Sequence, residues 1–229
     1  MQKVRYHFRD WHFGIACQSV GGHVYGFDVF EGLPGDGVYI FDNTLNEGLA
    51  VSHHVIDRIR QILPPSPSGG DAIDWERVYY STGWKFPTDY KEFVELYGGG
   101  EVDEYLSVRT PPVEGSPFGS ILEGVDPALP PDCHAELAPS LPASEELRLL
   151  PFGATGTGDV VFWLIAEVEE NWKVVTFRRQ SPYGEKRWSI FDGGMADFLW
   201  SLLNGSIEPF SQNFSDGEPH TYLSWRDWE

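Results

Sequence analysis

The stretch that decides the fold is residues 86–100, with the sequence FPTDYKEFVELYGGG. Its apolar and aromatic side chains recur three and four residues apart, as on one face of a helix, at Tyr90, Phe93, Val94 and Tyr97. Thr88 is a natural N-cap, and the triple glycine permits the positive φ angle at which helices end. The stretch therefore predicts one amphipathic helix that begins near Thr88 and stops at the glycines.

Further elements are predicted on both sides of this helix. Upstream, Asp74 precedes an aromatic segment that we expect to form a helix ending at Gly83. Downstream, residues 102–108 predict a strand, and residues 114–147 predict a long surface excursion with one helical turn near residues 144–149. The remaining pattern favours three strands of an antiparallel meander and a closing helix, at residues 159–165, 172–177, 188–191 and 195–203.

The chain divides at a segment rich in proline, glycine and serine, residues 63–70, in which we place a linker at residues 67–70. Residues 1–66 are predicted as a β-rich N-terminal extension or subdomain that ends in a helix. Residues 71–210 are predicted as the main domain, and residues 211–229 as a C-terminal tail.

The net charge of −19 excludes nucleic acid as a preferred ligand, because so acidic a chain repels the phosphate backbone. The imbalance is concentrated after residue 70, where the net charge is −17. Two cysteines suit neither a disulfide framework nor a four-ligand zinc site. No apolar run is long enough to cross a membrane, and the first residues lack the apolar stretch that a signal peptide would show. We therefore expect a cytoplasmic protein with no membrane partner.

Three motifs that carry chemistry elsewhere have simpler interpretations in this sequence. The glycine-rich residues 153–158 lack the lysine of a phosphate-binding loop. The adjacent His53 and His54 point in different directions on a helix and have no third ligand. Cys133 and His134 are sequence neighbours, whereas a nucleophile and its base usually meet through the fold. We predict no catalytic, cofactor-binding or metal-binding residue, and the Cys133–His134 enzyme stays the weakest alternative.

Acidic clusters are the feature that remains to be explained. Their plain interpretation is a solvated surface that keeps the protein soluble. Their sharper interpretation is a surface that complements a basic partner and speeds association. The candidate partner-binding residues are Glu101, Asp103, Glu104, Tyr105, Glu123, Asp126, Asp159, Glu167, Glu169 and Glu170.

Four aromatic residues are candidate interface anchors, because large rings often dominate binding energy. They are Trp84, Tyr105, Trp163 and Trp172. The continuous apolar run around Trp163 favours a strand buried on both faces, so Trp163 and Trp172 are predicted as core. Tyr105, next to Asp103 and Glu104, is left open between core and surface.

Residues 75–205 resemble the SUKH superfamily, which contains bacterial immunity proteins of polymorphic toxin systems and a yeast regulator of cell-wall synthesis. The resemblance is carried by residues 86–93 running into 97–100, by residues 150–153, by Gly158-Asp159 with Trp163, and by residues 196–199 near 202–205. It implies an α+β fold, in which helices pack on an antiparallel sheet, and no enzymatic activity. Residues 1–66 lie outside it.

The resemblance suggests an immunity protein that blocks a cognate toxin, such as a nuclease or deaminase, by stoichiometric binding without a cofactor. The acidity of this chain indicates that such a toxin would be basic. We expect a monomer or a weak homodimer. The alternative is a regulatory scaffold that binds host proteins, suggested by the yeast member.

Overall fold

The computed structural model describes residues 55–123, 129–141, 147–207, 210, 214 and 219–228, and four short strands between Gly14 and Val29. Contacts divide the chain into two compact units, Met1–Val51 and Ser52–Glu229. In the first unit, β1 (Gly14–Ile15) pairs antiparallel with β4 (Asp28–Val29), and β2 (Gln18–Val20) pairs antiparallel with β3 (His23–Tyr25). The predictions for the other residues of 1–54 lie outside the described residues.

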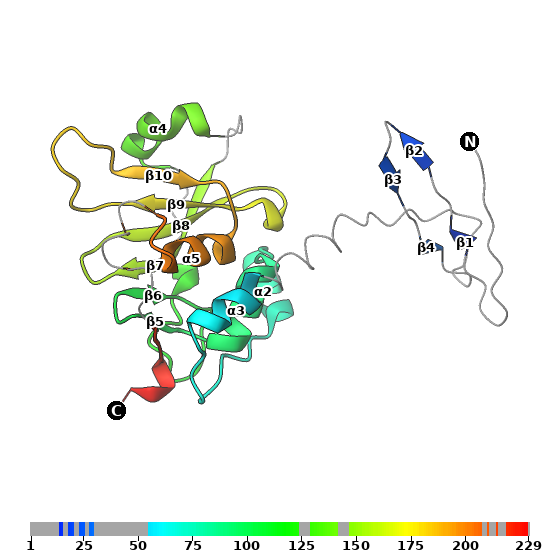
Figure 1. Cartoon of the computed structure of the whole chain (residues 1–229), viewed down its shortest axis with the longest axis horizontal. Helices are drawn as coiled ribbons and strands as arrows, with labels where there is room; N and C mark the ends of the chain where they lie inside the picture. The colour runs from blue at the N-terminus through cyan, green and yellow to red at the C-terminus, as the bar shows by residue number, and fades with distance from the viewer. Residues whose placement is uncertain are drawn as a thin grey trace. The chain divides into compact units, whose positions relative to one another are not determined.

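The second unit is built on one seven-stranded antiparallel sheet with the order β10-β9-β8-β7-β6-β5-β11 (Figure 1). Its strands are β5 (Gly100–Val102), β6 (Leu106–Val108), β7 (Arg148–Thr155), β8 (Val160–Ile165), β9 (Lys173–Phe177), β10 (Trp188–Phe191) and β11 (Tyr222–Ser224). The meander β8 to β10 and the α+β class with packed helices confirm the sequence prediction, and β7 extends the meander by one strand that was not predicted. β11, in the predicted tail, was not foreseen.

Helices cover the two faces of this sheet unequally. Residues 55–62 are helical, followed by α2 (Trp75–Thr82), α3 (Thr88–Tyr97), α4 (Pro131–Leu137) and α5 (Met195–Leu203), with short 3₁₀ turns η1 (Ile121–Glu123), η2 (Ala138–Ser140), η3 (Glu169–Asn171) and η5 (Trp225–Asp227). The main core contains the buried side chains of α3, of α5 and of the segment 55–63. On α4, Cys133 and Leu137 pack in a smaller cluster with β7 to β10. No helix in the described ranges is long and apolar enough to span a membrane.

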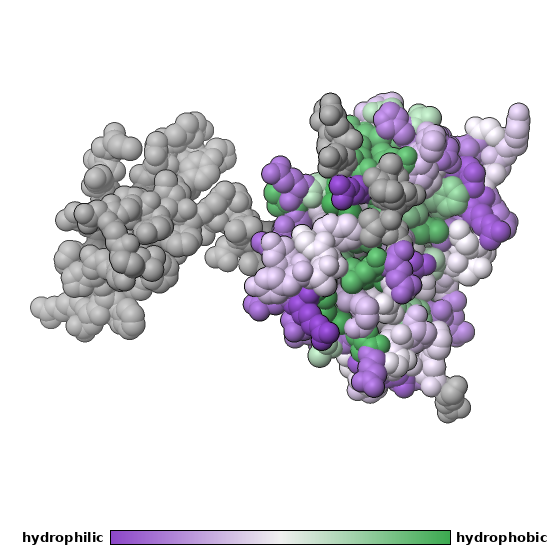
Figure 2. All heavy atoms as spheres, turned by 180° about the vertical axis from the view of Figure 1, so that it is seen from behind, coloured by the Kyte–Doolittle hydropathy of each residue, from purple (hydrophilic) through white to green (hydrophobic). Residues whose placement is uncertain are grey.

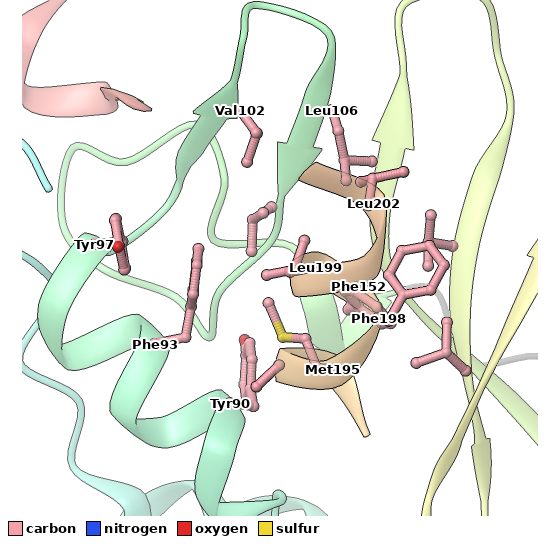
Figure 3. Packing of buried hydrophobic residues seen from close by; sticks show 14 of the residues in the cluster. Tyr90, Phe93, Tyr97, Val102, Leu106, Phe152, Met195, Phe198, Leu199 and Leu202 are labelled. Atoms are coloured by element: carbon pink, nitrogen blue, oxygen red, sulfur yellow. The ribbon is translucent and has the colours of Figure 1, made fainter. Parts of the chain in front are cut away.

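The main core is dominated by aromatic rings between α3, α5 and the sheet (Figure 3). Tyr90, Phe93 and Tyr97 form the buried face of α3, as their spacing predicts, and Met195 and Leu199 oppose them from α5. Trp163 and Trp172 are also buried, which confirms their assignment to the core. Seen from behind, the second unit also carries hydrophobic residues at its surface between hydrophilic ones (Figure 2).

The ends of the helices follow the sequence signals with one exception. Asp74 caps α2 by accepting a hydrogen bond from the Arg77 amide at 2.9 Å, and Gly83 ends α2 with a φ of 75°. Gly98 ends α3 with a φ of 70°. Thr88, however, is the first residue of α3 and not its N-cap. Its hydroxyl donates a hydrogen bond to the Glu170 carboxylate at 2.6 Å.

Two predicted elements are wrong. Residues 102–108 form not one strand but the β5–β6 hairpin, whose turn places Asp103 and Glu104 at φ values of 50° and 51°. Positive φ at both central residues is typical of a type I′ turn, which glycine and asparagine would have signalled. The helical turn near residues 144–149 is not formed in its described part, because Arg148 and Leu149 pair with β8. The long excursion also contains α4, which was not predicted.

Candidate interaction surface

The β5–β6 turn is fixed by Asp103, a candidate residue whose carboxylate is used inside the molecule. One Asp103 oxygen lies 2.7 Å from Nδ1 of buried His220, and the other accepts a hydrogen bond from the Thr221 amide at 2.7 Å. His220 Nε2 lies 2.8 Å from the Leu203 carbonyl oxygen. Asp103 therefore ties the hairpin to the segment before β11 and to the end of α5.

Two carboxylates of the same hairpin remain available to a partner. Glu104 is exposed in the turn, and Glu101 is half-exposed on β5, on the face opposite to buried Val102. Within the described ranges, neither side chain makes a hydrogen bond or an ion pair. Tyr105 is half-buried, with its ring 5.6 Å from that of Phe214, so it supports the hairpin from the core side.

Asp159 lies at the same end of the sheet, in the β7–β8 turn, because Leu106 pairs with Thr155. Its side chain is buried and accepts hydrogen bonds from the Arg179 amide at 2.8 Å and the Thr157 hydroxyl at 3.1 Å. These bonds join the β7–β8 turn to the connection that follows β9. Asp159 thus has a structural role that its sequence position did not reveal.

A second acidic group lies at the opposite end of the strands, in the β8–β9 connection. Glu170 accepts hydrogen bonds from the Thr88 amide at 3.1 Å and from the Thr88 hydroxyl at 2.6 Å, so it caps α3. Glu167 is exposed and Glu169 is half-exposed, and neither side chain has a bonding partner among the described residues. Because β8 spans about 17 Å, this group is well separated from the hairpin.

Sequence reasoning missed Asp89, which belongs to this second group. Its buried carboxylate accepts hydrogen bonds from the Tyr90 amide at 2.7 Å and from the Ala196 amide at 2.8 Å, so it caps α5 from the first turn of α3. Burial raises the pKa of Asp89 to about 6; the two amide bonds oppose the shift, and the nearby Glu170 and Asp197 add to it. The sequence offers one sign of this contact, the Gly193-Gly194 pair before α5. A side chain at Gly194 would place its Cβ too close to the Asp89 carboxylate, so glycine leaves room for it.

The raised pKa of Asp89 predicts how stability depends on pH. Between pH 4 and pH 6 the folded state binds the proton of Asp89 more tightly than the unfolded state, so this residue stabilises the protein most below pH 4. We expect its contribution, up to about 3 kcal/mol, to be lost as the pH rises through about 6. Urea unfolding across this range should show the loss in the wild type and not in Asp89→Asn. Parallel pH curves for the two proteins would contradict the raised pKa.

The two remaining candidates are separate from both groups. Glu123 is exposed at the end of η1, and Asp126 lies outside the described residues. The structure thus brings Glu101, Asp103, Glu104, Tyr105 and Asp159 to one end of the sheet, and Glu167, Glu169 and Glu170 to the other.

The described residues give the Cys133–His134 pair no reactive surroundings. Cys133 is fully buried in α4, and its burial, with Asp132 and Glu136 nearby, raises its pKa to about 12, which keeps the thiol unreactive. An apolar hollow under Tyr105, between the sheet and α5, is too small to hold a water molecule. No group of three potential metal ligands occurs in the part of the chain that the structure describes. His53 and His54 lie outside it.

Comparison with known protein families gives a match within the second unit. A family model described as SUKH_6, SMI1-KNR4 cell-wall, matches residues 74–216, which is more than half of the chain. Comparison with curated proteins and with solved structures gives no significant match. The matched range contains the main helices α2 to α5 and six of the seven strands, β5 to β10.

Proposed function

Since the chain belongs to the SUKH_6, SMI1-KNR4 cell-wall family, we propose that it is a cytoplasmic immunity protein that binds and blocks a basic toxin domain. A nuclease or a deaminase acting on nucleic acid is such a toxin, because its substrate requires a basic cleft. The protein acts by stoichiometric binding, as a monomer or weak homodimer, and performs no reaction of its own.

The observation that carries this proposal is a pair of carboxylates on the β5–β6 hairpin that have no bonding partner among the described residues. Glu101 and Glu104 are presented by a turn that Asp103 holds in place through His220 and Thr221. They therefore need no rearrangement to meet a basic surface, and a net charge of −19 adds long-range attraction. Such complementarity raises association rates by about 10- to 1,000-fold over a neutral pair.

The test begins with partner capture by the tagged full chain from its host, at low and at physiological salt. We expect one stoichiometric partner with a basic domain, whose toxicity in cells disappears when this protein is co-expressed. Several substoichiometric host proteins, with no toxic one among them, would contradict the immunity function. That result would favour the alternative of a regulatory scaffold, for which the cell-wall description of the family is the supporting observation.

Charge reversal on the hairpin should slow association with that partner. We expect the double variant Glu101→Lys, Glu104→Lys to associate at least about tenfold more slowly and to lose much of its salt dependence. Asp103 is left unchanged because its replacement would disturb the turn. Stopped-flow or surface-plasmon kinetics measure the rates.

The matched control reverses two exposed glutamates on other elements, Glu76 on α2 and Glu95 on α3. It changes the net charge by the same amount, so it isolates the contribution of position from that of total charge. Equal slowing in the two double variants would show that net charge alone steers the toxin. A larger effect from Glu167→Lys, Glu169→Lys would move the contact to the opposite end of the sheet.

A further inference from the structure

The connection between β9 and β10, residues 178–187, is a hairpin that extends beyond the sheet on the side of the β5–β6 and β7–β8 turns (Figure 1). We call residues 178–187 the basic arm. The Arg178 amide donates to the Arg187 carbonyl at 2.8 Å, and the Ser181 hydroxyl donates to the Lys186 carbonyl at 3.1 Å. At the tip, the Glu185 amide donates to the Pro182 carbonyl at 3.0 Å, which closes a turn. The arm is therefore an ordered element of the fold.

The charge of the basic arm is opposite to that of the molecule. It contains four basic residues and one acidic residue, a net charge of +3, on a chain with a net charge of −19. These are four of the eleven lysines and arginines found after residue 70. So strong a local reversal is more than the general solubility of the surface requires.

Two of the four cations are engaged inside the arm. The other two are exposed at its edges: Arg179 lies next to Gly158 of the β7–β8 turn, and Lys186 lies next to α4. Arg178 lies 3.7 Å from Glu185, and Arg187 stacks on the Phe177 ring and donates to arm carbonyls. Arg179 and Lys186 are exposed, and no carboxylate among the described residues pairs with either of them. The only contact of the Lys186 ammonium with a described residue is a 3.3 Å hydrogen bond to the Glu136 carbonyl.

The tip of the arm presents an aromatic ring to solvent. Tyr183 has a relative exposure of 108%, the highest among the exposed large hydrophobic residues of the described chain. It stands in a turn between Pro182 and Gly184, and Gly184 has a φ of 87°. Tyrosine and arginine are the residues that most often dominate binding energy at protein interfaces. A closed turn that exposes a tyrosine, on an arm with two exposed cations that pair with no carboxylate of the described residues, is suited to binding a partner.

We propose that the basic arm binds a carboxylate-rich protein segment, with Arg179 and Lys186 pairing with carboxylates and Tyr183 packing on the segment. This contact is separate from the proposed toxin contact, because it uses other residues and opposite charge. Both surfaces lie at the same end of the sheet, since Leu106 pairs with Thr155 and Val160 pairs with Phe177.

Charge favours a protein segment over nucleic acid as the occupant. At physiological salt the Debye length is about 8 Å, so Arg179 and Lys186 attract mainly the charges that lie close to the arm. A short acidic peptide segment can contact the arm alone. A nucleic acid extends beyond the arm, carries about one negative charge per 1.7 Å of duplex, and is repelled by the acidic surface of the protein.

The experiment measures binding of a short fluorescein-labelled oligoglutamate peptide to the full chain, by fluorescence anisotropy at low and at physiological salt. A single-stranded oligonucleotide of equal charge is the second probe. We expect the peptide to bind more tightly than the oligonucleotide. We expect Arg179→Glu, Lys186→Glu to weaken peptide binding at least about tenfold, and Tyr183→Ala to weaken it about fivefold or more.

The matched control is Arg77→Glu, Lys85→Glu, which makes the same charge change at two exposed cations on and after α2. It should bind the peptide within about twofold of the wild type when salt screens the net charge. Equal weakening in the two double variants would overturn the proposal. So would preferential binding of the oligonucleotide, or arm-dependent self-association of the chain without peptide binding. Thermal unfolding of each variant verifies that the fold is intact.

Discussion

Replacement of Asp71 by asparagine is expected to lower the free energy of unfolding by about 3 kcal/mol. The Asp71 carboxylate is 2% exposed and joins three segments of the fold. One oxygen accepts a hydrogen bond from the Gly99 amide at 2.8 Å, and the other accepts one from the Trp225 indole at 3.0 Å and lies 2.7 Å from the Arg226 guanidinium. An asparagine must turn its NH₂ group toward one of these donors, which leaves a buried donor unpaired.

The magnitude is set by the position of the ion pair. Losing one partner of a fully buried pair costs about 3–5 kcal/mol, and we expect the lower end because Arg226 is 27% exposed and recovers some hydration. The control is Asp57→Asn, which removes the exposed pair with Arg60 at 3.6 Å and should cost less than about 0.5 kcal/mol. Urea unfolding followed by tryptophan fluorescence measures both.

Hydrogen exchange separates global destabilisation from local opening. If Asp71 holds the C-terminal segment, Asp71→Asn should speed exchange most strongly in β11, which lies at the edge of the described sheet and pairs there with β5. Strands β8 and β9 in the middle should lose protection only as much as the global stability falls. A loss below about 1 kcal/mol with unchanged exchange in β11 would show that Asp71 does not tie these segments together.

The sequence alone predicts the elements whose signals are local. Helix α3, helix α5 and the meander β8 to β10 follow from residue spacing and from glycine and proline positions. β11 was not predicted, because an alternating pattern over three residues is too short to indicate a strand. The β5–β6 hairpin was not predicted, because its turn has positive φ angles at Asp103 and Glu104, where glycine or asparagine is the usual sequence signal.

The candidate site was predicted only at the level of charge. Acidic runs are visible in the sequence, but the carboxylates that the fold itself uses are not. Asp103 bonds to His220, 117 positions away, Glu170 bonds to Thr88, 82 positions away, and Asp89 bonds to Ala196, 107 positions away. Contacts over such separations depend on the tertiary fold, so only the structure shows that Glu101 and Glu104 have no partner in the described part of the chain.

Replacement of Trp163 by alanine is expected to cost about 3–5 kcal/mol, because it removes the ring around which the main core is packed. Trp163 is fully buried on β8. Its ring centroid lies 4.4 Å from that of Phe152, 4.7 Å from that of Tyr90 and 5.8 Å from that of Trp172. Alanine leaves a cavity that the surrounding strands and α3 can fill only in part. Equilibrium unfolding in guanidinium chloride measures the loss.

Trp163→Phe distinguishes the ring from its polar group. The Trp163 indole N–H is buried and has no acceptor among the described residues, so phenylalanine removes an unpaired donor while it keeps an aromatic ring in the core. We expect a cost of about 1–2 kcal/mol, from the smaller volume alone. If phenylalanine were as costly as alanine, the indole N–H would have a partner, and Trp163 would act through that hydrogen bond as well as through packing. A cost near that of ring shrinkage alone means that packing, and not a polar contact, explains the tryptophan at this position.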